Sequence, residues 1–138
     1  MNRSGRRRMR ETLAVATARQ REMVDLTPRL ASVVERSGVS DGWCRLFTRH
    51  TTAAVTIASL EPGAAEDLLD AFQAMVPDLP FRHSPPDHVP AHVLSAAIGV
   101  SADVPVADGR LWLGEFQRVV LVELDGPRDR EVMVEVGD

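Results

Sequence analysis

The fold is decided by the last third of the chain, residues 101–136, which read SADVPVADGRLWLGEFQRVVLVELDGPRDREVMVEV. Apolar side chains, mostly valine and leucine, either alternate with polar ones or run together in short segments, and both patterns are typical of β-strands. Asp108-Gly109 and Asp125-Gly126-Pro127 separate these segments and consist of residue types that favour turns. This third of the chain is therefore predicted to form a series of short strands.

The first part of the chain predicts two strands followed by a helix. Residues 11–26 are expected to form two short strands with a polar turn at 19–21, which suggests an opening hairpin. Thr27 as N-cap and Pro28 as the first helical residue begin a helix, and Gly38 ends it.

The middle of the chain completes an α+β pattern, a mixed β-sandwich with interspersed helices. Residues 43–50 alternate in polarity as a strand that ends at His50, and residues 53–57 continue as extended chain. Residues 77–90 hold five of the nine prolines and are expected to form an irregular loop. The helices before and after this loop are expected to bury these residues: Leu68, Leu69, Phe72 and Met75 in the first, and Val93, Leu94 and Ile98 in the second.

Length and charge limit the function classes. A chain of 138 residues is sized for one domain, residues 11–138, after a basic tail at 1–10 that is expected to be disordered. Without the five arginines of that tail the chain has 11 basic and 20 acidic residues, a net charge of −9, which argues against nucleic-acid binding. No apolar run reaches the roughly 20 residues of a membrane span or follows the arginines as in a signal peptide. The expectation is a cytoplasmic protein without membrane partners.

Residue types that are rare or missing narrow the chemistry further. All 16 basic residues are arginine, so a Schiff-base lysine and the lysine of a P-loop are both excluded. Cys44 is the single cysteine, which excludes an internal disulfide and a cysteine-rich zinc finger. Because it lies on an apolar strand face, Cys44 is expected in the core rather than as a nucleophile.

The four histidines all lie between positions 50 and 92 and are the main candidates for a functional site. Neutral imidazoles are common ligands of zinc, and three of them leave one coordination position open for water or substrate. A divalent metal, zinc above all, is therefore one interpretation. The alternative is a proline-rich surface loop that displays solvated histidines. The candidate ligands are His50, His83, His88 and His92.

Carboxylates and arginines supply candidate partners for these histidines. Asp87 is the preferred group to orient an imidazole or to act as a general base. Glu123 interrupts an apolar strand, so it is expected either to be catalytic or to form a buried ion pair with Arg110 or Arg128. These two arginines, together with backbone N–H groups at the helix that begins at Pro90, suit a phosphate group.

Four motifs follow one another along the chain. They are His50-Thr51-Thr52-Ala53, Ala91-His92, Asp108-Gly109-Arg110-Leu111-Trp112-Leu113-Gly114-Glu115-Phe116-Gln117 and Glu123-Leu124-Asp125-Gly126-Pro127-Arg128. In this order they resemble the YjbQ-like family over about residues 11–136. The resemblance implies an α+β fold that assembles as a homotrimer around a threefold axis, with sites near the subunit boundaries. It also implies weak thiamine-phosphate synthase activity, which joins a pyrimidine diphosphate to a thiazole phosphate with loss of pyrophosphate.

Roles are assigned to individual residues from the residue types and from the resemblance together. His50, with Asp87 and Glu123, is assigned to catalysis, and His50, His83 and His92 match the family's recurrent histidines and would hold the metal. The residues assigned to the substrate are Thr51, Thr52, Arg110, Gln117 and Arg128.

The chain departs from the family pattern in three places. His88 stands where Asn is usual, which adds one further metal ligand. Ala58-Ser59-Leu60 replaces Asn-Glu-Asn, and Glu115-Phe116-Gln117 replaces Thr-Trp-Gln. Three functions are therefore compared below: a synthase of this kind, a metal-assisted hydrolase of small phosphorylated molecules, and a non-catalytic trimer that binds a metal or metabolite.

Overall fold

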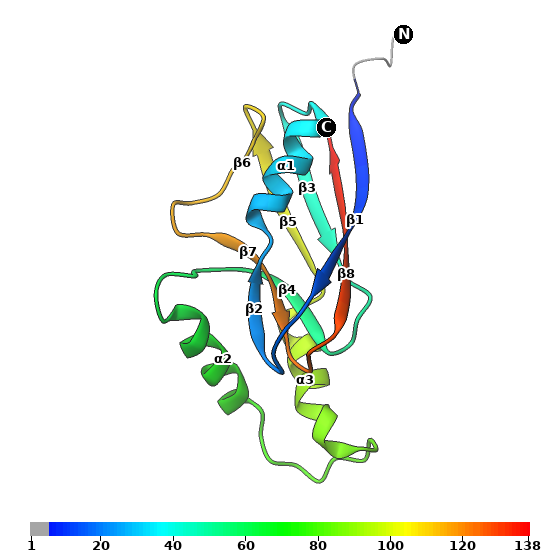
Figure 1. Ribbon diagram of the computed structural model, residues 1–138, viewed down its shortest axis with the longest axis vertical. Coiled ribbons are helices and arrows are strands. Elements are labelled where there is room, and N and C mark those ends of the chain that lie inside the picture. Colours follow the sequence, from blue (N-terminus) through cyan, green and yellow to red (C-terminus); the bar gives the residue numbers. More distant parts are fainter. Residues whose placement is uncertain (1–5) are drawn as a thin grey trace.

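Strands from the two ends of the chain pair to form the larger of two sheets in the computed structural model, which describes residues 6–138 (Figure 1). The first and last strands run antiparallel, from Arg8 opposite Gly137 to Ala16 opposite Asp129. The strands predicted within residues 101–136 are confirmed. In order across this sheet the strands are β1 (Arg8–Ala16), β8 (Asp129–Gly137), β3 (Gly42–Phe47), β5 (Ser101–Ala107) and β6 (Arg110–Leu111).

The smaller sheet has the order β2 (Glu22–Asp25), β7 (Arg118–Glu123), β4 (Ala53–Ala58). Every residue of β7 after Arg118 is buried, because this sheet is covered on both faces. The hairpin expected within residues 11–26 is wrong. β1 pairs with β8 while β2 pairs with β7, so the two strands belong to different sheets, each next to a distant partner with a matching apolar face.

The first helix, α1 (Thr27–Ser37), lies where its sequence signals predict. It ends at Gly38, whose φ of 69° is a left-handed conformation that favours glycine. The N-cap is Leu26, so the prediction of Thr27 as N-cap is wrong. Thr27 Oγ1 instead accepts the backbone N–H of Val119 at 2.8 Å, which attaches the start of the helix to β7.

Two further helices, α2 (Ala64–Met75) and α3 (Val89–Ile98), lie beside the smaller sheet, and the short helix η1 (Pro86–His88) leads into α3 (Figure 1). α2 has no fully buried residue, and Met75 is 70% exposed. Val93 on α3 is also exposed, so its predicted burial is wrong as well. Within residues 6–138, no helix has the length and apolar character needed to cross a membrane.

Apolar side chains gather in two clusters, one on each face of the smaller sheet. The larger cluster lies between the two sheets, where α1 contributes Leu30, Val33 and Val34. It includes Cys44, and burial raises the pKa of that thiol to about 12, which leaves it unreactive as a nucleophile. The second cluster lies between the smaller sheet and α2 and α3, and this packing fixes the position of α3.

The disordered tail expected at residues 1–10 is wrong for its last three positions. Arg8–Arg10 begin β1 and lie opposite the end of β8, whose backbone offers them hydrogen-bond partners. The guanidinium groups of Arg8 and Arg10 also contact the Glu135 carboxylate at 3.0 and 2.6 Å. Residues 1–5 of the expected tail lie outside the described part of the chain.

Candidate functional site

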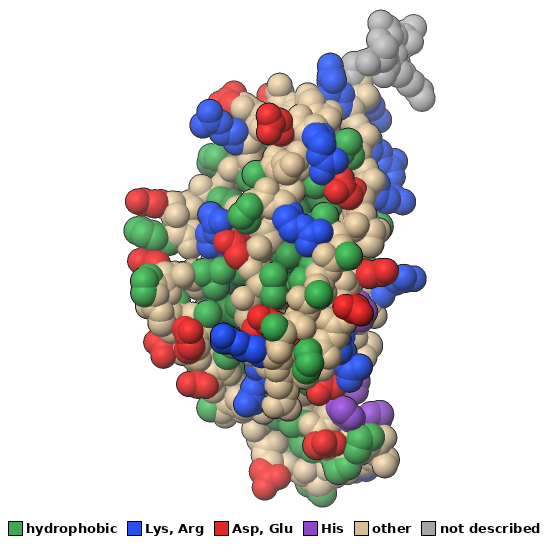
Figure 2. Space-filling model, in the orientation of Figure 1, with side chains coloured by type: hydrophobic (Ala, Val, Ile, Leu, Met, Phe, Trp, Pro, Cys, Tyr) green, Lys and Arg blue, Asp and Glu red, His purple; other side chains and the backbone are tan. Residues whose placement is uncertain are grey.

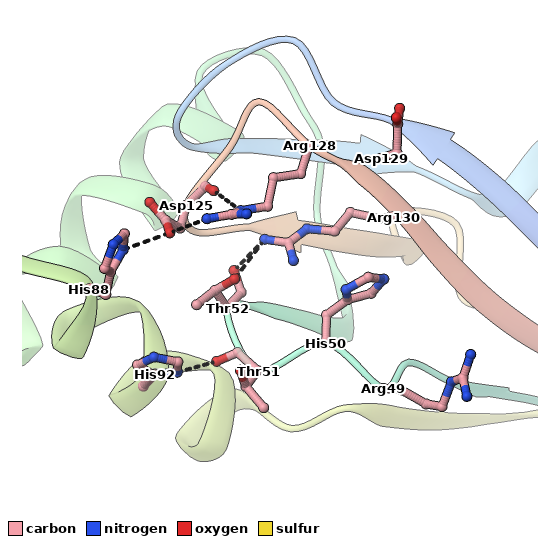
Figure 3. A pocket seen from close by; sticks show the side chains of 10 residues that line it. All are labelled: Arg49, His50, Thr51, Thr52, His88, His92, Asp125, Arg128, Asp129 and Arg130. Carbon is pink, nitrogen blue, oxygen red and sulfur yellow. Dashed lines mark hydrogen bonds and ion pairs between the residues drawn. The ribbon is translucent and has the colours of Figure 1, made fainter. Parts of the chain in front are cut away.

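A hollow of about 700 Å³ lies where the β3–β4 connection, the β7–β8 turn and the start of α3 meet (Figure 3). These segments come together because β7 pairs with β4 and β8 pairs with β3. Figure 2 shows histidine side chains along one edge of the lower half of the molecule. We call this hollow the histidine–arginine pocket, and it is lined by Arg49, His50, Thr51, Thr52, His88, His92, Asp125, Arg128, Asp129 and Arg130.

His88 has one ring nitrogen held by the protein and the other left for a ligand. Its Nδ1 lies 2.9 Å from Asp125 Oδ2. Partial burial opposes ionisation of Asp125, but hydrogen bonds from Arg128 and His88 outweigh it and hold the pKa of that carboxyl below its ordinary value. An ionised carboxylate can only accept, so Nδ1 of His88 donates and Nε2 is left without a protein partner among residues 6–138.

His92 is held in the same way by a backbone carbonyl. Its Nδ1 lies 2.9 Å from the carbonyl oxygen of Thr51, which again can only accept. Nε2 of His92 therefore also has no partner within the described range 6–138 and is left for a ligand. The ring of His83 meets the ring of His92 edge-on, with 5.1 Å between the centroids, but His83 does not line the pocket.

His50 is held through its other ring nitrogen. Its Nε2 accepts the backbone N–H of Glu131 at 3.0 Å, so Nδ1 carries the ring proton. Burial and the positive charge of Arg130 lower the pKa of His50, so the ring is neutral at neutral pH. His50 lies beyond the end of β3 at Phe47, in the connection to β4, and not in the strand as its alternating pattern predicts.

The histidines do not form the predicted metal centre within one chain. In the described range 6–138, no three side chains among His, Cys, Asp and Glu are grouped so as to hold a metal ion. Nε2 of His50 is engaged by Glu131, and His83 lies outside the pocket. A zinc site made by His50, His83 and His92 of a single chain therefore does not fit this arrangement, although His88 and His92 each present one free nitrogen.

Glu123 is the most deeply buried charged group near the pocket, and its partner is Arg130. The predicted pairs with Arg110 or Arg128 are wrong. Arg130 Nε donates to Glu123 Oε1 at 2.9 Å and Nη2 to Oε2 at 2.5 Å, while the Thr17 hydroxyl donates to Oε1 at 2.7 Å. Burial opposes ionisation of Glu123, but these hydrogen bonds outweigh it, so its pKa lies below the ordinary value. Glu123 therefore does not line the pocket, but it holds Arg130, which does.

Sequence reasoning missed Arg130, although a signal for it exists. Val132, Val134 and Val136 form the buried face of β8, and Arg130 continues the same alternation. A charged residue on a buried strand face requires a partner. Glu123 is also a charged residue on a buried strand face, at the end of β7 and just before the turn that leads to β8, so it needs a partner for the same reason. The two residues could therefore have been predicted to pair.

The other predicted residues divide between the pocket and the rest of the surface. Thr51, Thr52 and Arg128 line the pocket as expected. Asp87 is exposed, and within residues 6–138 it has no hydrogen bond to a histidine; Asp125 makes the contact expected of it. Arg110 and Gln117 line a separate hollow of about 480 Å³ beside α1, so one chain does not bring them to the histidines.

A sequence model of the family described as UPF0047 protein YjbQ-like matches residues 11–138. The UPF0047 protein of Methanothermobacter thermautotrophicus is 34% identical over 91% of this chain and 90% of its own length. The UPF0047 protein of Archaeoglobus fulgidus is 37% identical over 88% of this chain and 96% of its own length. The sequence similarity thus includes the histidine–arginine pocket.

Solved structures extend the similarity to the fold. A YbjQ-like protein of unknown function from Sulfolobus solfataricus has a TM-score of 0.89 and 36% identity, over 96% of this chain and 98% of that one. A hypothetical protein from Aeropyrum pernix has a TM-score of 0.86 and 33% identity, over 93% of this chain and 97% of that one. The sheets and helices described above are therefore shared with proteins from both sources.

Proposed function

The chain belongs to the UPF0047 YjbQ-like family, and on this premise we propose that it is an enzyme that acts on a phosphorylated small molecule in the histidine–arginine pocket. The specific reaction proposed is that of a thiamine-phosphate synthase, in which a pyrimidine diphosphate is joined to a thiazole phosphate and pyrophosphate is released. One observation carries the proposal: His88 and His92 each present a free Nε2 in a pocket that also contains arginines.

The arginines suit the charge of such a substrate. Guanidinium groups bind phosphate oxygens through paired, charge-assisted hydrogen bonds. Arg128 reaches the pocket while its Nη2 holds Asp125 at 2.9 Å. Arg49, by contrast, is largely exposed at the rim, 3.7 Å from Glu131, so it is expected to contribute little to such binding. Departing pyrophosphate gains negative charge, and cationic donors that are already in place would stabilise it.

The two imidazoles supply proton transfer. An imidazole whose Nδ1 is fixed by an acceptor keeps a defined orientation, and its Nε2 can exchange a proton with a reacting oxygen. In a synthase, the protonated form of the ring would donate a hydrogen bond from Nε2 to the leaving pyrophosphate. In a hydrolase, the same nitrogen would accept a proton from water, which is why hydrolysis of a phosphorylated small molecule is the second candidate.

We also propose that the chain forms a homotrimer around a threefold axis. Trp112 and Phe116 are 72% and 56% exposed, and apolar rings so open to solvent are common at interfaces between subunits. They lie within residues 110–117, the segment that carries Arg110 and Gln117, so assembly through these rings would allow this segment to approach the pocket of another subunit. Light scattering of the full-length chain is expected to give the mass of three chains, and a mass of one chain would contradict the proposal.

The reaction is tested with the full-length chain, purified without a histidine tag. It is incubated with the pyrimidine diphosphate and the thiazole phosphate, and the joined product and pyrophosphate are followed by mass spectrometry and a coupled assay. We expect both products to form in equal amounts. The metal content of the same preparation is measured, and activity is compared before and after chelation and after addition of zinc.

Omitting the thiazole phosphate provides the control. Release of phosphate or pyrophosphate without that partner would favour the hydrolase. Substrate binding without turnover would favour a non-catalytic binding protein, and a lack of both binding and turnover would contradict the proposed substrate class. Loss of activity on chelation would show that a metal takes part, which the histidines of a single chain do not predict.

A further inference from the structure

We propose that Arg130 forms the floor of an oxyanion subsite in the histidine–arginine pocket and that its ligand is a phosphate group. The inference rests on the proposed function, because it names the protein group that would hold the substrate's phosphate. Arg110 and Arg128 are the arginines that sequence patterns suggest for this role. Arg130 differs from both of them because it is almost completely buried, with 3% of its side chain exposed.

The hydrogen bonds of Arg130 leave one end of its guanidinium group unused. A guanidinium has five N–H donors. The Nε donor is directed to Glu123 Oε1, and Nη2 donates to Glu123 Oε2 and to the carbonyl and hydroxyl oxygens of Thr52, at 3.0 and 2.9 Å. Both donors of Nη1 have no protein partner among residues 6–138. They are the two N–H groups that remain available.

These two donors are open to the pocket. No fully buried side-chain nitrogen or oxygen within the described residues lacks a partner, so Nη1, which has none, is reached by solvent. Arg130 lines the histidine–arginine pocket, and in Figure 3 its free nitrogen points into the space between Thr52 and His50. A nearly buried arginine that directs two donors into a hollow is a preorganised anion-binding group, unlike a mobile arginine on the surface.

The same contacts hold the subsite rigid. Glu123 and Thr52 fix Nε and Nη2, so Nη1 needs no reorganisation when an anion arrives, and little side-chain entropy is lost. Glu123 also balances the charge of Arg130, which lets the arginine stay buried while the pocket is empty. Arg128 also lines the pocket, but its Nε and Nη2 are directed to Asp125, so Arg130 is the arginine with two unused donors held in place.

The test compares Arg130→Lys with Arg49→Lys in the full-length chain. Lysine at position 130 has a single nitrogen, which pairing with Glu123 holds away from the pocket, so the two donors of Nη1 that face the ligand are lost. Arg49→Lys makes the same change at an exposed arginine of the same pocket. Binding of inorganic phosphate and pyrophosphate is measured by calorimetry, with acetate as a carboxylate control. Arg130→Lys is expected to weaken phosphate binding about tenfold or more, and Arg49→Lys less than about threefold.

A second measurement does not depend on how the variant folds. In ¹⁵N-labelled wild-type protein, the Nε–H signal of Arg130 should exchange slowly, because it is buried and bound to Glu123. We expect this signal to shift as phosphate is added.

The outcomes separate the subsite from the proposed function. Equal phosphate binding by wild type and Arg130→Lys, with an unmoved Arg130 signal, would overturn the subsite and leave the proposed function standing. Acetate binding as tight as phosphate binding would overturn the choice of phosphate. A wild type that binds neither phosphate nor pyrophosphate would contradict the proposed function, and the subsite with it.

Discussion

Replacing Glu123 with alanine is expected to lower the free energy of unfolding by about 3–5 kcal/mol. The reason is that the change removes the carboxylate that balances Arg130 and leaves a guanidinium charge buried without a counter-ion. The change also removes the hydrogen bonds that the carboxylate accepts from the Thr17 hydroxyl and from the backbone N–H of Leu124. Urea unfolding followed by circular dichroism at neutral pH measures the effect.

Glu35→Ala is the matched control. Glu35 is exposed on α1, and its loss is expected to change stability by no more than about 0.5 kcal/mol. A destabilisation by Glu123→Ala as small as that of the control would show that the buried pair adds nothing to stability.

The pH dependence of stability tests the ion pair between Glu123 and Arg130 without removing a side chain. The pKa of Glu123 is lowered in the folded chain, so its contribution to stability is present above the ordinary glutamate pKa. That contribution is lost as the pH falls through the lowered value. The Glu123→Gln variant has no ionisable group at this position and lacks this contribution at every pH. The difference in free energy of unfolding between wild type and the variant should therefore become smaller as the pH is lowered. A difference that stays constant would contradict the lowered pKa.

Replacing His88 with alanine is expected to reduce turnover by about 10²–10⁴-fold in the assay of the proposed reaction, if His88 transfers a proton there. His88 is partly exposed and its ring makes one hydrogen bond, so the fold should be retained. Steady-state kinetics should show a fall in kcat with little change in KM, because the arginines that bind phosphate are untouched. A variant that keeps full kcat would remove His88 from the mechanism.

Two carboxylate variants distinguish the predicted orienting group from the observed one. Asp125→Asn should lower kcat about 10–100-fold, because the amide cannot serve as the ionised acceptor of His88 Nδ1. Asp87→Asn, at an exposed position with no hydrogen bond to a histidine within residues 6–138, should leave kcat nearly unchanged. The opposite order of effects would restore Asp87 as the orienting group.

The sequence predicted the elements of the fold better than their partners. The end of α1 at Gly38 depends on glycine, and the irregular chain at 77–85 depends on proline, because the backbone preferences of both residue types are local. The rest of the loop predicted at 77–90 is wrong, since η1 and the start of α3 occupy residues 86–90. The strands of residues 101–136 follow from an alternation that any sheet would satisfy. β1 pairs with β8 and β2 pairs with β7, and in each pair the two strands are far apart in the sequence. Local sequence rules cannot detect such pairs, so the hairpin that they predicted for residues 11–26 was wrong.

The same distinction between local patterns and distant contacts applies to the candidate site. The amino-acid sequence by itself predicted that several histidines, Arg128 and the His50-Thr51-Thr52 motif lie together, because residue type and the order of motifs are enough for that. Only the tertiary structure decided that Asp125 rather than Asp87 holds His88 and that Arg130 pairs with Glu123. The contact between His88 and Asp125 spans 37 positions of sequence, and that between His50 and Glu131 spans 81. Contacts over such separations depend on sheet register and on the packing of α3, which local patterns do not encode.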